Sequence, residues 1–131
     1  MLERDTSEDE IPSTIAHYIE LLWFVDCPNH LAARALIDEV VAELAPASTI
    51  RDIDATDPRV AERVRFPGSP TIRVDGRDVQ PGFQDPGDYT PRCRVYPNGG
   101  RMERIPPRAW IEAALADRLP DAPLAPSRRS R

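Results

Sequence analysis

The residues best suited to chemistry are a cysteine and a histidine in the motif Cys27-Pro28-Asn29-His30. An apolar run that predicts a strand precedes the motif, and a segment with helical periodicity follows it. The free N–H groups and the dipole at a helix start stabilise an anion, so a cysteine here is favoured as its thiolate. His30 can add positive charge or accept a proton. Cys27 is therefore a candidate nucleophile or soft-metal ligand, and the alternative is a small buried residue at a tight turn.

Cys93 is the second cysteine, and its position depends on which strands pair. If strand 71–74 pairs with 77–80, the loop 81–92 returns to the same end of the sheet and delivers Cys93 near Cys27. If 94–96 is the pairing strand, Cys93 starts at the opposite end and is a buried core residue. Two cysteines are too few for a disulfide scaffold, so they are either buried structural residues or reactive thiols of a functional site. The sequence leaves both positions open.

The elements that must position these residues alternate between strands and helices. Strands are expected over 16–25, 49–54 and 71–74, and helices over 29–44, 57–66 and 106–118. Asp75-Gly76 predicts a tight hairpin, 77–92 an irregular loop, and 94–96 a candidate strand before a turn at 97–100. This order predicts an α/β domain with a central mixed β-sheet flanked by helices.

Local signals give the limits of the helices. Asp57-Pro58 is typical of a helix start, with an aspartate N-cap and a proline in the first turn, and Pro28 is expected in the first turn of helix 29–44. Apolar residues that recur every four positions predict the buried face of that helix: Ala32, Leu36, Val40 and Leu44. The alternating acids Asp52, Asp54 and Asp57 are expected to be solvated or capping rather than metal-binding.

The composition favours one folded domain and excludes several functions. The chain has 131 residues, 40% hydrophobic and 30% charged, and we predict a domain over 15–118 between a disordered acidic segment 1–14 and a disordered Pro/Arg-rich tail 119–131. All 17 basic residues are arginine, which excludes Schiff-base lysine chemistry. The net charge of −5 argues against nucleic-acid or membrane binding. With no apolar membrane span and no signal peptide, we expect a cytoplasmic monomer or weak dimer without a cofactor.

Ser69-Pro70-Thr71 stands directly before strand 71–74, where a cis proline can set the chain direction. Together with the Cys27–His30 motif, the sequence GSPTIRVDG over 68–76 resembles the thioredoxin-like fold, and the resemblance covers about residues 16–116. It implies that Cys27 is the attacking thiol and that Pro70 is a cis-proline facing it. It also implies a substrate surface with these members: Pro28, Asn29, Ser69, Pro70 and Thr71.

His30 occupies the position at which a dithiol enzyme of that family has its resolving cysteine. The resemblance therefore implies single-thiol redox chemistry on a small-molecule thiol or a protein disulfide. An extended substrate would pair with the backbone of Ser69, next to Cys27. A thioredoxin-fold binding module that has lost the chemistry is an alternative.

A more distant resemblance is to the organomercurial (alkylmercury) lyases. In that family a Cys-x-x-Asp motif and a later cysteine hold mercury, while the aspartate protonates the leaving carbon. Cys27 and Cys93 match the two thiols in order, but His30 stands where the acid should be and Asp26 lies at a different spacing. The alternative function is thus lyase-like chemistry or binding of a soft metal, with Cys27 and Cys93 as the metal ligands.

Overall fold

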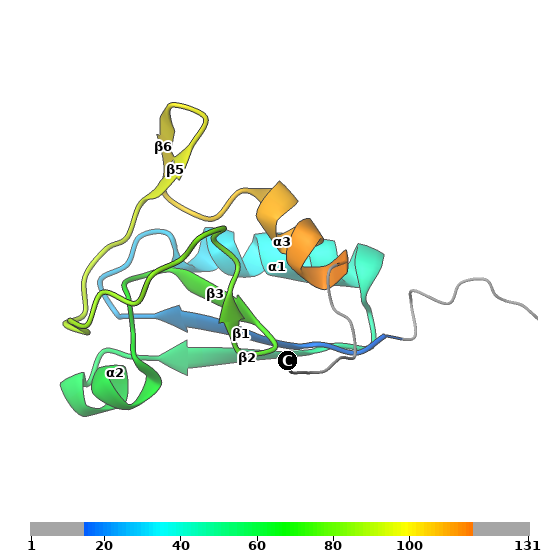
Figure 1. The fold of residues 1–131 in the computed structure, drawn as a ribbon. Helices are drawn as coiled ribbons and strands as arrows, with labels where there is room; N and C mark the ends of the chain where they lie inside the picture. Colours follow the sequence, from blue (N-terminus) through cyan, green and yellow to red (C-terminus); the bar gives the residue numbers. More distant parts are fainter. Residues whose placement is uncertain (1–14, 117–131) are drawn as a thin grey trace, which may run out of the picture.

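The computed structural model describes residues 15–116, so the predicted segments 1–14 and 119–131 lie outside the described residues (Figure 1). Strands and helices alternate along the first part of the chain, which confirms the predicted α/β class. The elements are β1 (Tyr18–Trp23), α1 (His30–Leu44), β2 (Thr49–Asp54), α2 (Pro58–Val64), β3 (Thr71–Val74), β4 (Arg77–Asp78), β5 (Tyr96–Asn98), β6 (Arg101–Glu103) and α3 (Arg108–Ala116).

The central sheet is mixed, as expected, and has the strand order β2-β1-β3-β4. β1 runs parallel to β2 and antiparallel to β3, with Leu22 of β1 opposite Thr71 of β3. Figure 1 shows α1 and α3 on one side of the sheet and α2 on the other. The apolar sequence of β1 follows from this position, because Ile19 and Leu21 face one core cluster and Leu22 faces the other.

The buried face of α1 matches the predicted one only in part: Val40 is buried and Leu36 packs against the core, as predicted. Its buried residues are Ala33, Ile37, Val40 and Val41, whereas Ala32 is exposed and Leu44 is 39% exposed. Small and apolar residues occur all around this helix, so periodicity alone does not single out one face. Contacts with both β1 and α3 select the face that is buried.

The two other helices agree with the local signals, although α2 is shorter than predicted and α3 begins two residues later than predicted. Asp57 is the N-cap of α2, and its side chain accepts a hydrogen bond from the backbone of Arg59. That helix ends at Val64, and Arg65 follows in a left-handed conformation. α3 begins at Arg108 and buries Ile111 and Leu115. Among residues 15–116, none of the helices has the length and apolar character needed to cross a lipid bilayer.

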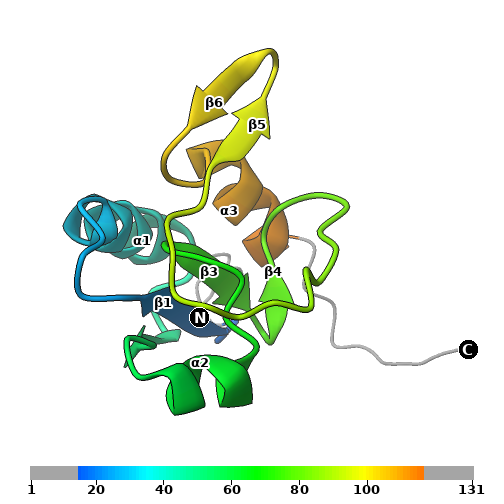
Figure 2. The same cartoon turned by 90° about the vertical axis from the view of Figure 1, so that its left-hand side faces the viewer.

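Two tight hairpins complete the fold. Asp75 and Gly76 both have positive φ angles, 52° and 86°, which is the geometry of a two-residue turn, and they join β3 to β4 as predicted. β5 and β6 form a separate two-stranded hairpin that projects from the domain (Figure 2). The candidate strand 94–96 was misplaced, because β5 begins at Tyr96 and pairs with β6 rather than with β3.

Candidate functional site around Cys27 and Ser69–Pro70

The antiparallel pairing of β1 and β3 brings two predicted site segments to one end of the sheet. β1 ends at Trp23 and β3 begins at Thr71, next to its partner Leu22. The loop after β1 carries Cys27, whose N–H donates to the carbonyl of Phe24 at 3.0 Å. The Ser69–Pro70 peptide bond lies directly before β3 and is cis, as the sequence predicted.

Cys27 lies farther from the helix than its sequence position suggested. Asn29 is the N-cap of α1, its side chain makes no capping hydrogen bond, and the helix begins at His30. Pro28 therefore precedes the helix instead of belonging to its first turn, which corrects the predicted boundary. Cys27 is a free thiol of intermediate burial.

His30 is held by Trp23 of β1 and by Asp52 of the edge strand β2. Its ring stacks on Trp23 with the ring centroids 4.0 Å apart, and its Nε2 lies 3.1 Å from Oδ1 of Asp52. Asp52 also accepts a hydrogen bond from the guanidinium of Arg34. Asp52 therefore orients His30, a role that no local sequence pattern indicated.

The neighbouring acids have structural partners, as expected. Asp54 accepts hydrogen bonds from the backbone and the hydroxyl of Thr56, and Asp57 caps α2. Within the described range, no group of three or more His, Cys, Asp or Glu side chains is arranged to hold a metal ion.

The backbone around Cys93 pairs with Ser69. The N–H of Ser69 donates to the carbonyl of Arg92 at 2.8 Å, and the N–H of Arg94 donates to the carbonyl of Ser69 at 2.9 Å. Cys93 is thus directly opposite Ser69 in a short parallel bridge. Of the two positions considered from sequence, the one with β4 as the partner of β3 is observed. Cys93 is exposed, so its interpretation as a buried core residue is wrong.

This bridge corrects the expected substrate surface. Both backbone groups of Ser69 that an extended substrate would use are already bonded to the protein's own chain. Ser69 and Thr71 are fully buried, and Pro70 is also among the fully buried side chains. The Thr71 hydroxyl donates to the carbonyl of Gly68 at 2.6 Å. The segment 92–94 therefore occupies the backbone edge at Ser69, which was predicted to be open to an extended substrate.

Arg94 fixes this segment through a buried ion pair. Its side chain is 8% exposed, and that of its partner Asp78 is 2% exposed. The guanidinium donates to the two carboxylate oxygens at 2.8 and 3.1 Å, and also to Gln80 and to the Thr71 hydroxyl. It also lies over the rings of Phe83 and Tyr96. Sequence reasoning missed this pair, because nothing in the local pattern separates Arg94 from the other arginines.

Tyr96 connects the segment to the cis-proline. It is fully buried, and its hydroxyl donates to the carbonyl of Pro70. Burial raises the pKa of Tyr96 far above its ordinary value, Arg94 opposes the shift, and a charge on Cys27 adds to it. Tyr96 therefore holds the segment at the cis-proline, at the end of the sheet that also carries the Cys27 loop.

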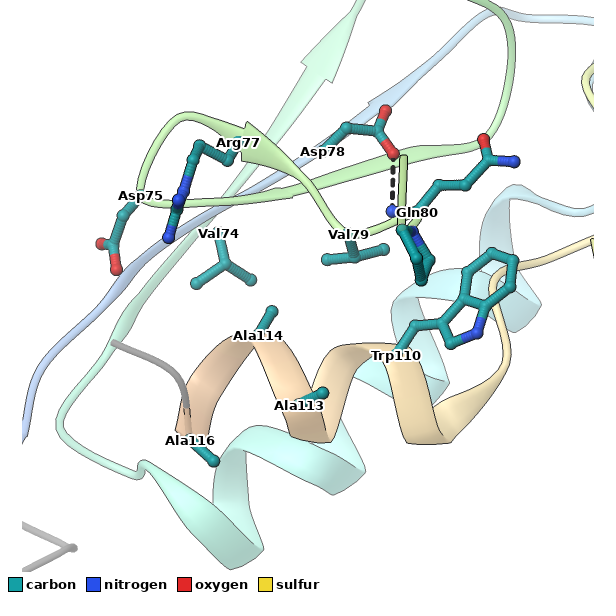
Figure 3. Close-up of a pocket in the computed structure, with 11 residues that line it drawn as sticks. Val74, Asp75, Arg77, Asp78, Val79, Gln80, Trp110, Ala113, Ala114 and Ala116 are labelled. Carbon is teal, nitrogen blue, oxygen red and sulfur yellow. Dashed lines mark hydrogen bonds between the residues drawn. The ribbon is translucent and has the colours of Figure 1, made fainter. Parts of the chain in front are cut away.

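A pocket of about 620 Å³ lies away from this site, between the β3–β4 hairpin and α3 (Figure 3). Val74 and Val79 face Ala114 and Trp110 across it, while the polar side chains belong to the hairpin. Neither cysteine lines this pocket. The predicted thiol site is therefore at the end of the sheet and not in this cavity.

No protein-family model matches the chain, and no curated protein matches it. The chemistry of the site must therefore be inferred from its geometry. That geometry is a half-buried thiol after β1, a cis-proline at the start of β3, and a second thiol on a segment bonded to Ser69.

Proposed function

We propose that this chain is a thioredoxin-like protein in which Cys27 carries out thiol–disulfide exchange. The sheet order β2-β1-β3-β4, with β1 and β2 parallel and with a helix directly after the cysteine loop, supports this assignment. The observation that carries the proposal is the convergence of Cys27 with the cis Ser69–Pro70 bond at one end of the sheet.

The reaction needs only one thiol to begin. The Cys27 thiolate attacks one sulfur of a disulfide R–S–S–R′, forms a mixed disulfide with R–S, and releases R′–S⁻. An incoming thiol then attacks the mixed disulfide and restores Cys27. His30 follows Cys27 by three residues in the sequence and is oriented by Asp52. It can accept the proton that the Cys27 thiol loses.

The substrate class follows from the occupied backbone of Ser69. A polypeptide substrate that adds a strand needs free N–H and C=O groups, and at Ser69 both are bonded to residues 92 and 94. A small disulfide needs only access to the Cys27 sulfur. We therefore propose low-molecular-weight thiols and disulfides as the substrates.

Alkylation of the full-length chain at neutral pH tests the role of Cys27. We expect Cys27, as the attacking thiol, to react faster than Cys93 although Cys93 is more exposed. Cys27→Ser should remove the fast phase, and Cys93→Ser, the matched control, should leave it. Slow alkylation of both thiols, or a fast phase that belongs to Cys93, would reject the proposal.

One observation favours a second candidate, the binding of a soft metal. The bridge between Ser69 and Cys93 keeps the second thiol on the segment that returns to the Cys27 end of the sheet. Two thiolates that reach one Hg(II) ion would bind it with linear geometry. A titration should then give one ion per chain, and either cysteine variant should lose this stoichiometry. We expect no efficient carbon–mercury cleavage, since neutral histidine is a poor replacement for the acid of the lyases.

A further inference from the structure

The segment that carries Cys93 is held at the site by anchors on both sides of the cysteine. On one side the carbonyl of Arg92 accepts from the Ser69 N–H, and on the other the N–H of Arg94 donates to the Ser69 carbonyl. The buried Arg94–Asp78 pair and the Tyr96–Pro70 hydrogen bond extend the second anchor. Cys93 itself is exposed. The segment is thus bound at the edge of β3 while the thiol stays accessible.

Gly68 makes this close approach feasible. Its φ angle is +128°, and a Cβ built on it would lie 2.8 Å from the Cβ of Arg94 and 3.4 Å from the carbonyl oxygen of Arg92. Any other residue at position 68 would push the segment away. The backbone around Ser69 is therefore shaped to receive residues 92–94.

The same segment passes the loop that carries Cys27. In Figures 1 and 2 the last part of the chain before β5 passes beside the loop between β1 and α1, at the end of the sheet where β1 ends. Tyr96, which continues the segment, binds the carbonyl of Pro70 directly before β3, at the end of the sheet where β1 also ends. Both cysteines are free thiols in this structure.

We propose that Cys93 is the resolving thiol of this site and closes an intramolecular disulfide with Cys27. Residues 92–94 occupy the edge at which a substrate strand would pair, so Cys93 takes the position of a substrate cysteine. This inference rests on the proposed function, in which Cys27 is the attacking thiol. It replaces an external thiol in the second step by a residue of the chain.

The chemistry balances with a small disulfide as the oxidant. Cys27 attacks R–S–S–R′, forms the mixed disulfide with R–S and releases R′–S⁻. The Cys93 thiolate then attacks the sulfur of Cys27, the bond to R–S breaks, and R–S⁻ leaves. The two leaving thiolates take up the two protons that Cys27 and Cys93 lose. The substrate is thereby reduced by two electrons, the cysteine pair is oxidised, and two external thiols later reduce the pair.

Mass spectrometry of the full-length chain mixed with oxidised glutathione tests this step. In the wild type we expect a brief glutathione adduct on Cys27 and then a Cys27–Cys93 disulfide, identified by peptide mapping. An effective concentration on the order of 1 mM for the tethered thiol makes this resolution about 100-fold faster than exchange between chains at about 10 µM. The rate should not depend on protein concentration. Cys93→Ser should retain the adduct.

The outcomes separate the two proposals. If Cys93→Ser forms no adduct at Cys27, the proposed function fails and the resolving role fails with it. If the adduct forms but persists equally in the wild type and in Cys93→Ser, the resolving role is wrong and the single-thiol reaction stands.

A glycine pair tests whether the position of the segment matters. Gly68→Ala should slow the resolution step and leave adduct formation at Cys27 unchanged, because the added Cβ meets Arg94. Gly87→Ala is the matched control, since Gly87 also has a positive φ of 77° but has nothing within 4 Å of an added Cβ. Equal resolution rates in the two variants would contradict the proposed role of the segment.

Discussion

Replacing Asp78 by asparagine removes the counter-charge of a buried arginine and keeps the size of the side chain. The carboxylate accepts two hydrogen bonds from Arg94, at 2.8 and 3.1 Å, and the side chains are 2% and 8% exposed. In Asp78→Asn the guanidinium keeps its contacts with Gln80 and Thr71 but has no opposite charge beside it. We expect the fold to be destabilised because a buried charge is left uncompensated.

The expected loss in the free energy of unfolding of Asp78→Asn follows from the burial of the ion pair. Removing one partner of a buried ion pair costs about 3–5 kcal/mol, and the remaining polar contacts of Arg94 favour the lower end, about 3 kcal/mol. The control is Asp38→Asn, which breaks the exposed pair with Arg34, whose side chains are 34% and 54% exposed. Such exposed i,i+4 pairs contribute about 0.3–0.5 kcal/mol. The two variants should therefore differ by about 2 kcal/mol or more.

Urea unfolding followed by circular dichroism measures both free energies. The midpoint should fall strongly in Asp78→Asn and little in Asp38→Asn, with similar slopes. The double variant Asp78→Leu with Arg94→Met should recover part of the loss, because no unpaired charge remains. A loss in Asp78→Asn no larger than that in Asp38→Asn would refute the argument that this pair is buried and anchors the segment 92–94.

Three further predictions concern burial and pH. Burial raises the pKa of Tyr96 above its ordinary value of 10.0. The stability that this shift contributes is fully present below pH 10.0 and is lost as the pH rises through the pKa of Tyr96 in the folded protein. Tyr96→Phe should make the free energy of unfolding, measured in urea, fall less steeply at alkaline pH. The hydrogen bond from the Tyr89 hydroxyl is the main cause that lowers the pKa of Asp85 below 3.8. Asp85→Asn should therefore destabilise the fold at neutral pH, and this effect should disappear as the pH falls through the folded pKa of Asp85. An equal effect at neutral pH and at acidic pH would contradict this. Ile37→Ala should cost about 2–5 kcal/mol in thermal or urea unfolding and Leu44→Ala clearly less, because only Ile37 is fully buried; equal losses would favour the face predicted from sequence.

Features that depend on neighbours along the chain could be read from the sequence. The N-cap at Asp57, the hairpin at Asp75-Gly76, the cis bond before Pro70 and the central position of β1 all match their local signals. Each signal acts within a few residues, through a capping oxygen, a backbone that accepts positive φ, or the ring of proline. The α/β class follows from these elements in their order, whereas the juxtaposition of the Cys27 loop with the start of β3 was implied only by the resemblance to the thioredoxin-like fold.

Only the tertiary structure decided which distant residues complete the site. Cys93 pairs with Ser69 because the chain after β4 returns to the end of the sheet, and two strand pairings were compatible with the sequence. Arg94 and Asp78 form an ion pair because folding buries both side chains at the same place. Their local sequence patterns do not differ from those of the other arginines and aspartates. The buried face of α1 was likewise selected by its contacts with β1 and α3. Such contacts depend on how the elements dock, because a residue's local pattern does not specify the surface that it will meet.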